Sequence, residues 1–420
     1  MQLIKVAAFG LRGMSAAAKF LLVMYIASAG SAELLGQVAI ITAITTLFSQ
    51  VAGLEINQVI GRRLHALNSA GLVQILRSQA IICFGAYVLL VPVALFSYTD
   101  IFAPYWASII LILILEHLIT EAYRLNILLL RPVFASCLLF IKNVGWVILF
   151  VGISEINREK MTFELMLNCW AVVLILTGLP LALFAWNRNR SENKSTLKTS
   201  IKKIPALMSE SIPFIACSIF TAFAGTIDKI IIGKYFSISE LGIFFFFSTF
   251  ASILSLVVTF SVGSTTGPEC IKVHTTQGLQ EFLVCLSKLK KQYLITISIT
   301  AFLVIITSIP TLIIMEKISY FPYFWILISM VISAGFLALC DPFKLEEYLS
   351  KRDSSLVIGN AFHLISLVIG ITISSLTSNI NFVAIGIMLS SILTFIFFAM
   401  RGPRKLAQLF NFINNTTQTR

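Results

Sequence analysis

Charged residues are scarce in this chain of 420 residues: Asp, Glu, Lys and Arg make up 12% of it, whereas 58% of it is hydrophobic. An average soluble domain is about 25% charged, so a soluble globular protein is excluded. Long polar stretches are missing too. The longest, residues 187–203 and 266–292, fall below the roughly 40 residues that a domain needs to fold without staples. We therefore expect any binding or chemistry to occur within a membrane or at its surface.

Motifs for nucleotide and metal chemistry are absent from the sequence. A P-loop needs GxxxxGK[ST], but the pair Gly233 and Lys234 is followed by Tyr235, and Asp228 stands where the motif needs its first Gly. The four His residues show no metal-ligand spacing. The seven Cys residues form no CxxC pair, so we expect small core side chains there. The sequence thus predicts no ATPase, no metal and no cofactor.

A membrane-embedded glycosyl enzyme, such as a polysaccharide polymerase, would be expected to show a carboxylate-rich loop or a large outer loop. The one acidic cluster, Asp341 with Glu346 and Glu347, is mixed with basic residues such as Lys344. We interpret it as a solvated cytoplasmic loop. No large outer loop is predicted, which makes the polymerase the weakest of the alternatives.

Apolar runs of about 20 residues, the length of a membrane-spanning helix, recur along the whole chain. They predict an all-α polytopic membrane protein with twelve spans. The predicted spans are residues 7–29, 34–60, 76–97, 102–124, 133–154, 164–186, 204–227, 239–264, 293–315, 320–340, 355–376 and 381–400.

The positions of Lys and Arg test this count. Of 31 basic residues, 21 fall in the termini and in the loops after every second span, 5 fall in the other loops and 5 fall within the spans. Lys and Arg are retained on the cytoplasmic side of membrane proteins. The distribution therefore predicts that both termini are cytoplasmic, and it accounts for the net charge of +12 without a nucleic-acid partner.

The segment 187–203 divides the spans into two sets of six. We expect an N-terminal bundle at 1–186, a basic cytoplasmic linker at 187–203, a C-terminal bundle at 204–400 and a basic cytoplasmic tail at 401–420. A shift of 206 positions places Ser31, Leu35 and Gly36 on identical residues, between the first two spans of each set. This suggests a duplicated six-helix unit, with the bundles related by a pseudo-two-fold axis along the membrane normal.

A stripe of basic residues lies along the first span. Lys5, Arg12 and Lys19 repeat at seven-residue spacing and so share one helix face. One interpretation is that Arg12 anchors the helix at the headgroups and Lys19 snorkels back towards them. The other is a ladder of cations for an anionic headgroup.

The remaining charged residues at membrane depth are candidates for coupling transport to an ion gradient, because such groups need a partner or water. Two interpretations stay open: proton carriage, or simple ion pairing, either of Glu121 with Arg124 within one span or of Lys142 with Glu55, Glu116 or Glu210. Pro213 would kink the span that carries Glu210. The ion-coupling candidates are Glu55, Glu116, His117, Glu121 and Glu210, three of which share one helix face with Arg124.

Short motifs in both halves resemble those of a known family. They are residues 31–36 (Ser-Ala-Glu-Leu-Leu-Gly), Gly53-Leu54, Arg62-Arg63, 228–233 (Asp-Lys-Ile-Ile-Ile-Gly) and 239–242 (Ser-Glu-Leu-Gly). Together with Pro213 and Pro268, the set is similar to the bacterial O-antigen and polysaccharide flippases. These belong to the multidrug, oligosaccharidyl-lipid and polysaccharide exporter superfamily.

The resemblance implies a multidrug-and-toxin-extrusion-like fold and a non-enzymatic function in the bacterial inner membrane. The implied activity is alternating-access translocation of a sugar repeat unit on undecaprenyl pyrophosphate, with membrane lipids and other polysaccharide assembly proteins as partners. Arg12, Lys19, Arg124 and Lys142 are then the candidate contacts of the substrate. A cation-coupled multidrug exporter of the same fold is the main alternative.

Overall fold

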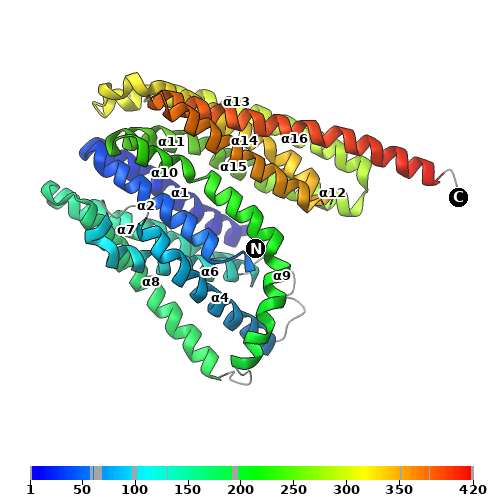
Figure 1. Cartoon of the computed structure of the whole chain (residues 1–420), viewed down its shortest axis with the longest axis horizontal. Coiled ribbons are helices and arrows are strands. Elements are labelled where there is room, and N and C mark those ends of the chain that lie inside the picture. The colour runs from blue at the N-terminus through cyan, green and yellow to red at the C-terminus, as the bar shows by residue number, and fades with distance from the viewer. Residues whose placement is uncertain are drawn as a thin grey trace. The chain divides into compact units, whose positions relative to one another are not determined.

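The computed structural model describes residues 2–56, 60, 69–96, 102–129, 131–191, 197–350, 352–377 and 379–417. All regular elements in this part of the chain are helices (Figure 1). Twelve of them are long and apolar enough to cross a membrane, and each overlaps one of the predicted spans. The prediction of an all-α, twelve-span membrane protein is therefore confirmed.

The helices up to the middle of the chain include six of these spans and the beginning of a seventh. Their bounds are α1 (Gln2–Ala29), α2 (Ala32–Ala52), α4 (Ser69–Phe96), the 3-10 helix η2 (Ala103–Tyr105), α6 (Trp106–Leu128), α7 (Pro132–Ile156), η3 (Arg158–Lys160), α8 (Phe163–Ser191) and α9 (Leu197–Ala224). Within this group α1 packs mainly on α7, and α6 packs on α7 and α8.

The second set begins with the short helix α10. Its bounds are α10 (Ile227–Tyr235), α11 (Ile238–Val258), the π-helix η4 (Thr259–Gly263), α12 (Ser264–Thr276), α13 (Leu279–Ile314), η5 (Ile318–Tyr323), α14 (Phe324–Leu349), α15 (Asp353–Ser375) and α16 (Ile380–Thr417). Here α14 packs on α16 and α11, and α15 packs on α16.

The chain separates into two compact units, Met1–Thr226 and Ile227–Arg420. Helix α9 belongs to the first unit and packs on α4 and α2, although the sequence interpretation assigned its span to the C-terminal bundle. The division at residues 187–203 stays a prediction, and part of that segment, 192–196, lies outside the described residues.

Two corresponding helices support the proposed duplication. Ser31 caps α2 by accepting a hydrogen bond from Leu34 N at 3.1 Å, and Ser237 caps α11 by accepting one from Glu240 N at 3.2 Å. The two helices have the same length of 21 residues, and both bounds of α11 lie 206 positions after those of α2.

Both helices are also interrupted at the same repeat position. After α2 the chain turns at Gly53, and Leu54 and Glu55 have φ angles of 45° and 47°. After α11, the π-helix Thr259–Gly263 takes the place of that turn. The continuous helix predicted for residues 34–60 is therefore wrong at Gly53, because short apolar segments carry no signal for such a break.

The acidic cluster near residue 341 also differs from its prediction. Helix α14 continues to Leu349, and Glu346 and Glu347 are buried within it. Lys290 Nζ lies 3.4 Å from Glu346, and Arg352 lies 4.0 Å from Glu347. These two cations allow a helix to continue where a solvated loop was expected.

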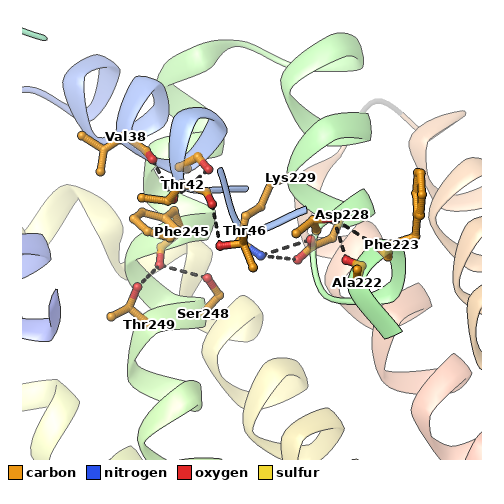
Figure 2. A network of polar contacts seen from close by, with 12 residues as sticks. Val38, Thr42, Thr46, Ala222, Phe223, Asp228, Lys229, Phe245, Ser248 and Thr249 are labelled. Atoms are coloured by element: carbon orange, nitrogen blue, oxygen red, sulfur yellow. Dashed lines mark hydrogen bonds and ion pairs between the residues drawn. The ribbon is translucent and has the colours of Figure 1, made fainter. Parts of the chain in front are cut away.

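Several hydroxyl side chains in the helices donate to a backbone carbonyl three or four residues earlier. Figure 2 shows Thr42 donating to Val38 O at 2.7 Å, and Ser248 and Thr249 both donating to Phe245 O. It also shows the ion pair of Asp228 with Lys229 at 3.1 Å, within one of the family-like motifs. Such local bonds let polar residues lie in a membrane-spanning helix.

The cysteines are free, as predicted. Four of them, Cys83, Cys169, Cys270 and Cys340, are buried. Burial raises the pKa of the Cys270 thiol, on α12, to about 12, so this thiol stays protonated and packs as a small apolar group.

Candidate functional site

Helix α6 carries the charged face that the sequence predicted. Glu116 and His117 are buried, at 6% and 0% exposure, and Glu121 and Arg124 are partly buried. A helix brings residues three and four apart onto one face. All of these side chains lie in the first unit, where α2, α4, α7 and α9 supply their partners.

The first contact group joins α6 to α7. Lys142 Nζ lies 2.7 Å from Glu116 Oε1 and donates to Thr120 Oγ1 at 2.7 Å. Lys142 therefore takes one of the three partners expected from the sequence. The pair is fully enclosed, since each side chain is about 8% exposed.

The second contact group centres on Arg124. Its Nη1 atom lies 3.2 Å from Glu121 Oε1 and 3.5 Å from Glu55 Oε1, so one guanidinium nitrogen serves two carboxylates. Ser218 on α9 donates to Glu55 Oε1 at 3.1 Å. The internal pair of Glu121 with Arg124 that the sequence suggested is present, and the contacts extend to the turn after α2 and to α9.

The interruption after α2 positions Glu55 for this contact. Leu54 and Glu55 both adopt the left-handed conformation, which costs a residue with a side chain about 1 kcal/mol or more. Gly53 is required by close approach: a Cβ atom there would lie 3.0 Å from Glu121 Oε1 and 3.1 Å from His117 Nε2. The turn thus lies directly against the charged face of α6.

His117 has a partner on one side only. Its Nδ1 atom is hydrogen-bonded to the Tyr87 hydroxyl, and its buried Nε2 atom has no hydrogen bond. The Nε2 atom lies 3.7 Å from Glu121 Oε1, within ion-pair range but beyond a hydrogen bond. Glu121 Oε2 accepts a hydrogen bond from Gln79.

The sequence interpretation did not include Gln79 or Tyr87 in the site. They lie eight residues apart on α4, with Cys83 midway between them, and this spacing in an apolar helix was the signal that could have identified them. A cavity of about 210 Å³ opens beside them. It is lined by Leu76, Gln79, Ala80, Cys83, Tyr87, His117, Leu118, Glu121, Ala122 and Leu125.

The cations of α1 are placed differently. Arg12 Nε donates to Ser136 Oγ at 3.1 Å, and the guanidinium carbon lies 6.0 Å from the centroid of the Tyr123 ring. Lys19 is exposed, and it has no hydrogen bond or ion pair with any residue that the structure describes. Glu116 and Lys142 are the charged groups within electrostatic range of Lys19. The side chain of Lys5 lies outside the described residues.

The structure therefore brings together most of the predicted site residues. Glu55, Glu121, Arg124 and His117 form one cluster, and Glu116 forms a pair with Lys142. Glu210 is exposed on α9 and takes no part in the contacts described above. Among the residues that the structure describes, no group of His, Cys, Asp and Glu could hold a metal ion.

No protein-family model and no curated protein matches the sequence. Solved structures do match. A multidrug resistance MATE family transporter of the MOP superfamily, in an inward-facing conformation, has a TM-score of 0.65 at 12% identity over 91% of this chain and 93% of that one. The lipid II flippase MurJ, in an inward closed conformation, has a TM-score of 0.67 at 15% identity. That match covers 95% of this chain and 87% of the flippase chain.

A third structure, of a MATE transporter in complex with MaL6, has a TM-score of 0.61 at 12% identity and covers 97% of this chain and 96% of that one. The matches extend over nearly the whole chain, although few residues are identical. They show that this chain, with its twelve candidate spans, shares its overall fold with the matched MATE transporters and the lipid II flippase MurJ.

Proposed function

We propose that this protein translocates an anionic lipid-linked saccharide across the bacterial inner membrane by alternating access. The substrate would be an oligosaccharide repeat unit on undecaprenyl pyrophosphate. The observation that carries this proposal is the pair Arg12 and Lys19, two cations within a spanning helix that have no carboxylate partner among the described residues. By contrast, Arg124 and Lys142 are already paired with acids.

The position of Lys19 on α1 supports a role in binding rather than anchoring. Met14 and Leu21 are 56% and 60% exposed, as expected of lipid-facing residues. Lys19 lies about 140–160° away from both around the helix. Ile26, seven residues further along the face of Lys19, is fully buried. Lys19 is therefore solvent-accessible on the inner face of α1.

The free-energy cost of placing a charged lysine within the membrane also supports a binding role for Lys19. A charge near the centre of a membrane helix costs about 2.5–3.5 kcal/mol on insertion scales. Lys142 offsets this cost with Glu116, but Lys19 has no such contact. It also lies about 10 Å further along the helix than Arg12, which makes snorkelling back to the same headgroups less effective. Phosphate oxygens would satisfy both cations.

The comparisons support the proposal at the level of the fold. The matched flippase is named for lipid II and the matched transporters for multidrug resistance, so both substrate classes occur on this fold. The lack of a P-loop in the sequence favours a carrier driven by a gradient. The charge distribution supports a cytoplasmic location for both termini.

Translocation in reconstituted vesicles tests the function. The probe is a fluorescent undecaprenyl-pyrophosphate-linked saccharide, and its movement is read by quenching in the outer leaflet. We expect Lys19→Ala to slow movement by about tenfold or more, since a hydrogen bond to a charged group contributes about 1.5–3 kcal/mol. Lys19→Arg should retain much of the rate.

Lys160→Ala is the matched control, because Lys160 is exposed in the connection after α7. If the parent does not move this lipid, the proposal is wrong. If Lys19→Ala equals the parent, Lys19 only snorkels and the substrate contacts lie elsewhere.

A cation-coupled drug exporter is the second candidate. It is favoured by the cavity beside α4 and α6, where mainly apolar side chains surround the carboxylate of Glu121. Such a site would suit an apolar amine. Ethidium efflux from the same vesicles distinguishes the two functions: efflux without movement of the lipid would favour the exporter.

A further inference from the structure

The geometry points to a single proton-binding site formed by His117 and Glu121, whose occupancy decides whether Arg124 pairs with Glu121 or with Glu55. The inference deepens the proposed function, since it rests on that function for the work that the proton performs. It assigns the proton to one pair of side chains and names the structural change that follows.

The first step of the inference concerns the Nε2 atom of His117, which is buried without a hydrogen bond. His117 is completely buried, its Nδ1 atom is engaged by Tyr87, and its Nε2 atom has no hydrogen bond. An unpaired buried polar atom costs about 1–3 kcal/mol. Glu121 Oε1 lies 3.7 Å away, so a movement of less than about 1 Å would close a hydrogen bond of ordinary length. With the imidazole hydrogen on Nδ1 and donated to Tyr87, Nε2 is an acceptor, and a proton on Glu121 would supply that bond.

The second step of the inference concerns the guanidinium of Arg124, which two carboxylates share. Glu55 Oε1 and Glu121 Oε1 both lie within ion-pair range of Arg124 Nη1. The two carboxylates therefore compete for one nitrogen of Arg124. Glu121 is the one that also faces the imidazole of His117, so the proton is best held by the pair as a whole.

The third step is the consequence for Arg124. A charged Glu121 holds Arg124 at 3.2 Å, but a neutral Glu121 leaves Glu55 as the carboxylate that attracts it. Glu55 lies in the left-handed turn after α2, and Gly53 in the same turn lies against both His117 and Glu121. Uptake or loss of the proton therefore acts directly on the interruption between α2 and the residues that follow it.

Beyond Arg124 and Glu55, the described groups around the pair are mostly neutral. Gln79, Cys83 and Tyr87 face it from α4. The charged residue on α7 is Lys142, which is paired with Glu116 of α6. On α9, Ser218 donates a hydrogen bond to Glu55. The described side chains of α8 include one charged residue, the exposed Glu164, and η2 contributes none.

The cavity of about 210 Å³ provides access to the pair. Its polar lining is confined to Gln79, Tyr87, His117 and Glu121, next to the atoms that would exchange the proton. A water molecule occupies about 30 Å³ of liquid volume, so several could enter, provided they lie at this polar end.

The first experiment detects the proton without any substrate. Infrared difference spectra between high and low pH, recorded on the purified parent protein, should show the carbonyl band of a protonated carboxyl group. The band should vanish in Glu121→Gln and persist in Glu164→Gln. In Tyr87→Phe the band should remain but titrate at a different pH, because Tyr87 contacts His117 directly.

The second experiment measures coupling in the vesicles described above. With one proton per cycle, a gradient of one pH unit should alter the rate by up to about tenfold, faster in one direction and slower in the other. Glu121→Gln should move the lipid at a rate that does not respond to the gradient. Glu164→Gln should behave as the parent.

The outcomes separate this inference from the proposed function. A parent protein that shows the infrared band but moves no lipid contradicts the function and leaves the proton site intact. Lipid movement that ignores pH, or that follows a sodium gradient instead, overturns the proton site and leaves the function intact. Should Glu121→Gln fail to fold, a titrating band in the parent that is unaffected by Tyr87→Phe would also overturn the assignment.

Discussion

Lys142 Nζ and Glu116 Oε1 lie 2.7 Å apart in the interior of the first unit, and this pair fixes α7 against α6. Thr120 accepts a further hydrogen bond from Lys142, whereas Glu116 Oε2 has no hydrogen bond. Lys142 therefore has two polar partners, Glu116 and Thr120, whereas one carboxylate oxygen of Glu116 has none. The pair is a structural element that excludes Lys142 from free contact with an anionic substrate.

Removal of one partner should destabilise the first unit. Lys142→Met leaves Glu116 as a buried, unpaired charge, for which we expect a loss of about 3–5 kcal/mol. The double variant Lys142→Met with Glu116→Leu should be close to the parent. Denaturant unfolding in detergent measures both, and a double variant as unstable as the single one would contradict the assignment.

Gly53→Ala should impair transport while the protein still accumulates in the membrane. The added Cβ atom would meet Glu121 Oε1 at 3.0 Å and His117 Nε2 at 3.1 Å, so the turn or the pair must shift. We expect a rate loss of about threefold, since the contacts require shifts of a few tenths of an ångström and a displacement of about 1 Å costs about a hundredfold. Gly152→Ala, whose new Cβ would meet nothing within 4 Å, is the matched control in the vesicle assay.

In the second unit, the crossing of α15 and α16 depends on two glycines. A Cβ atom at Gly370 would lie 2.8 Å from Gly386 O, and one at Gly386 would lie 2.6 Å from Gly370 O. Small residues allow this kind of close backbone approach in membranes. Gly386→Ala should lower stability by about 1–3 kcal/mol, as overpacking does. Gly267→Ala, which meets nothing within 4 Å, should be neutral in the same thermal unfolding measurement.

The orientation of the chain can be tested with a phosphatase reporter that is active only outside the cytoplasm. Fusions after Ser195 should be silent and fusions after Ser378 active, because basic residues concentrate on the side of the first position. Both positions lie outside the described residues. An active fusion after Ser195 would reverse the predicted topology.

The spans and the charged face of α6 could be predicted because hydropathy and helical spacing are local properties. The partner of Lys142 could only be narrowed to three acids, since the choice depends on how α6 packs on α7. The turn at Gly53 was missed because the apolar run continues past it, and the side chain that an added Cβ would meet, Glu121, lies 68 positions along the chain. The buried Glu346 was missed for the same reason: its partner, Lys290, lies on another helix.

The paired interruptions after α2 and α11 have a consequence for the history of the chain. Under the proposed duplication, an interruption at the same repeat position in both halves is most simply inherited from the ancestral six-helix unit. The acid is not shared, since the residue 206 positions after Glu55 is Ser261. We therefore expect the interruption to predate the duplication and the charge difference to postdate it. The two halves would then share an inherited helix interruption and differ in the charged residues that were acquired beside it later.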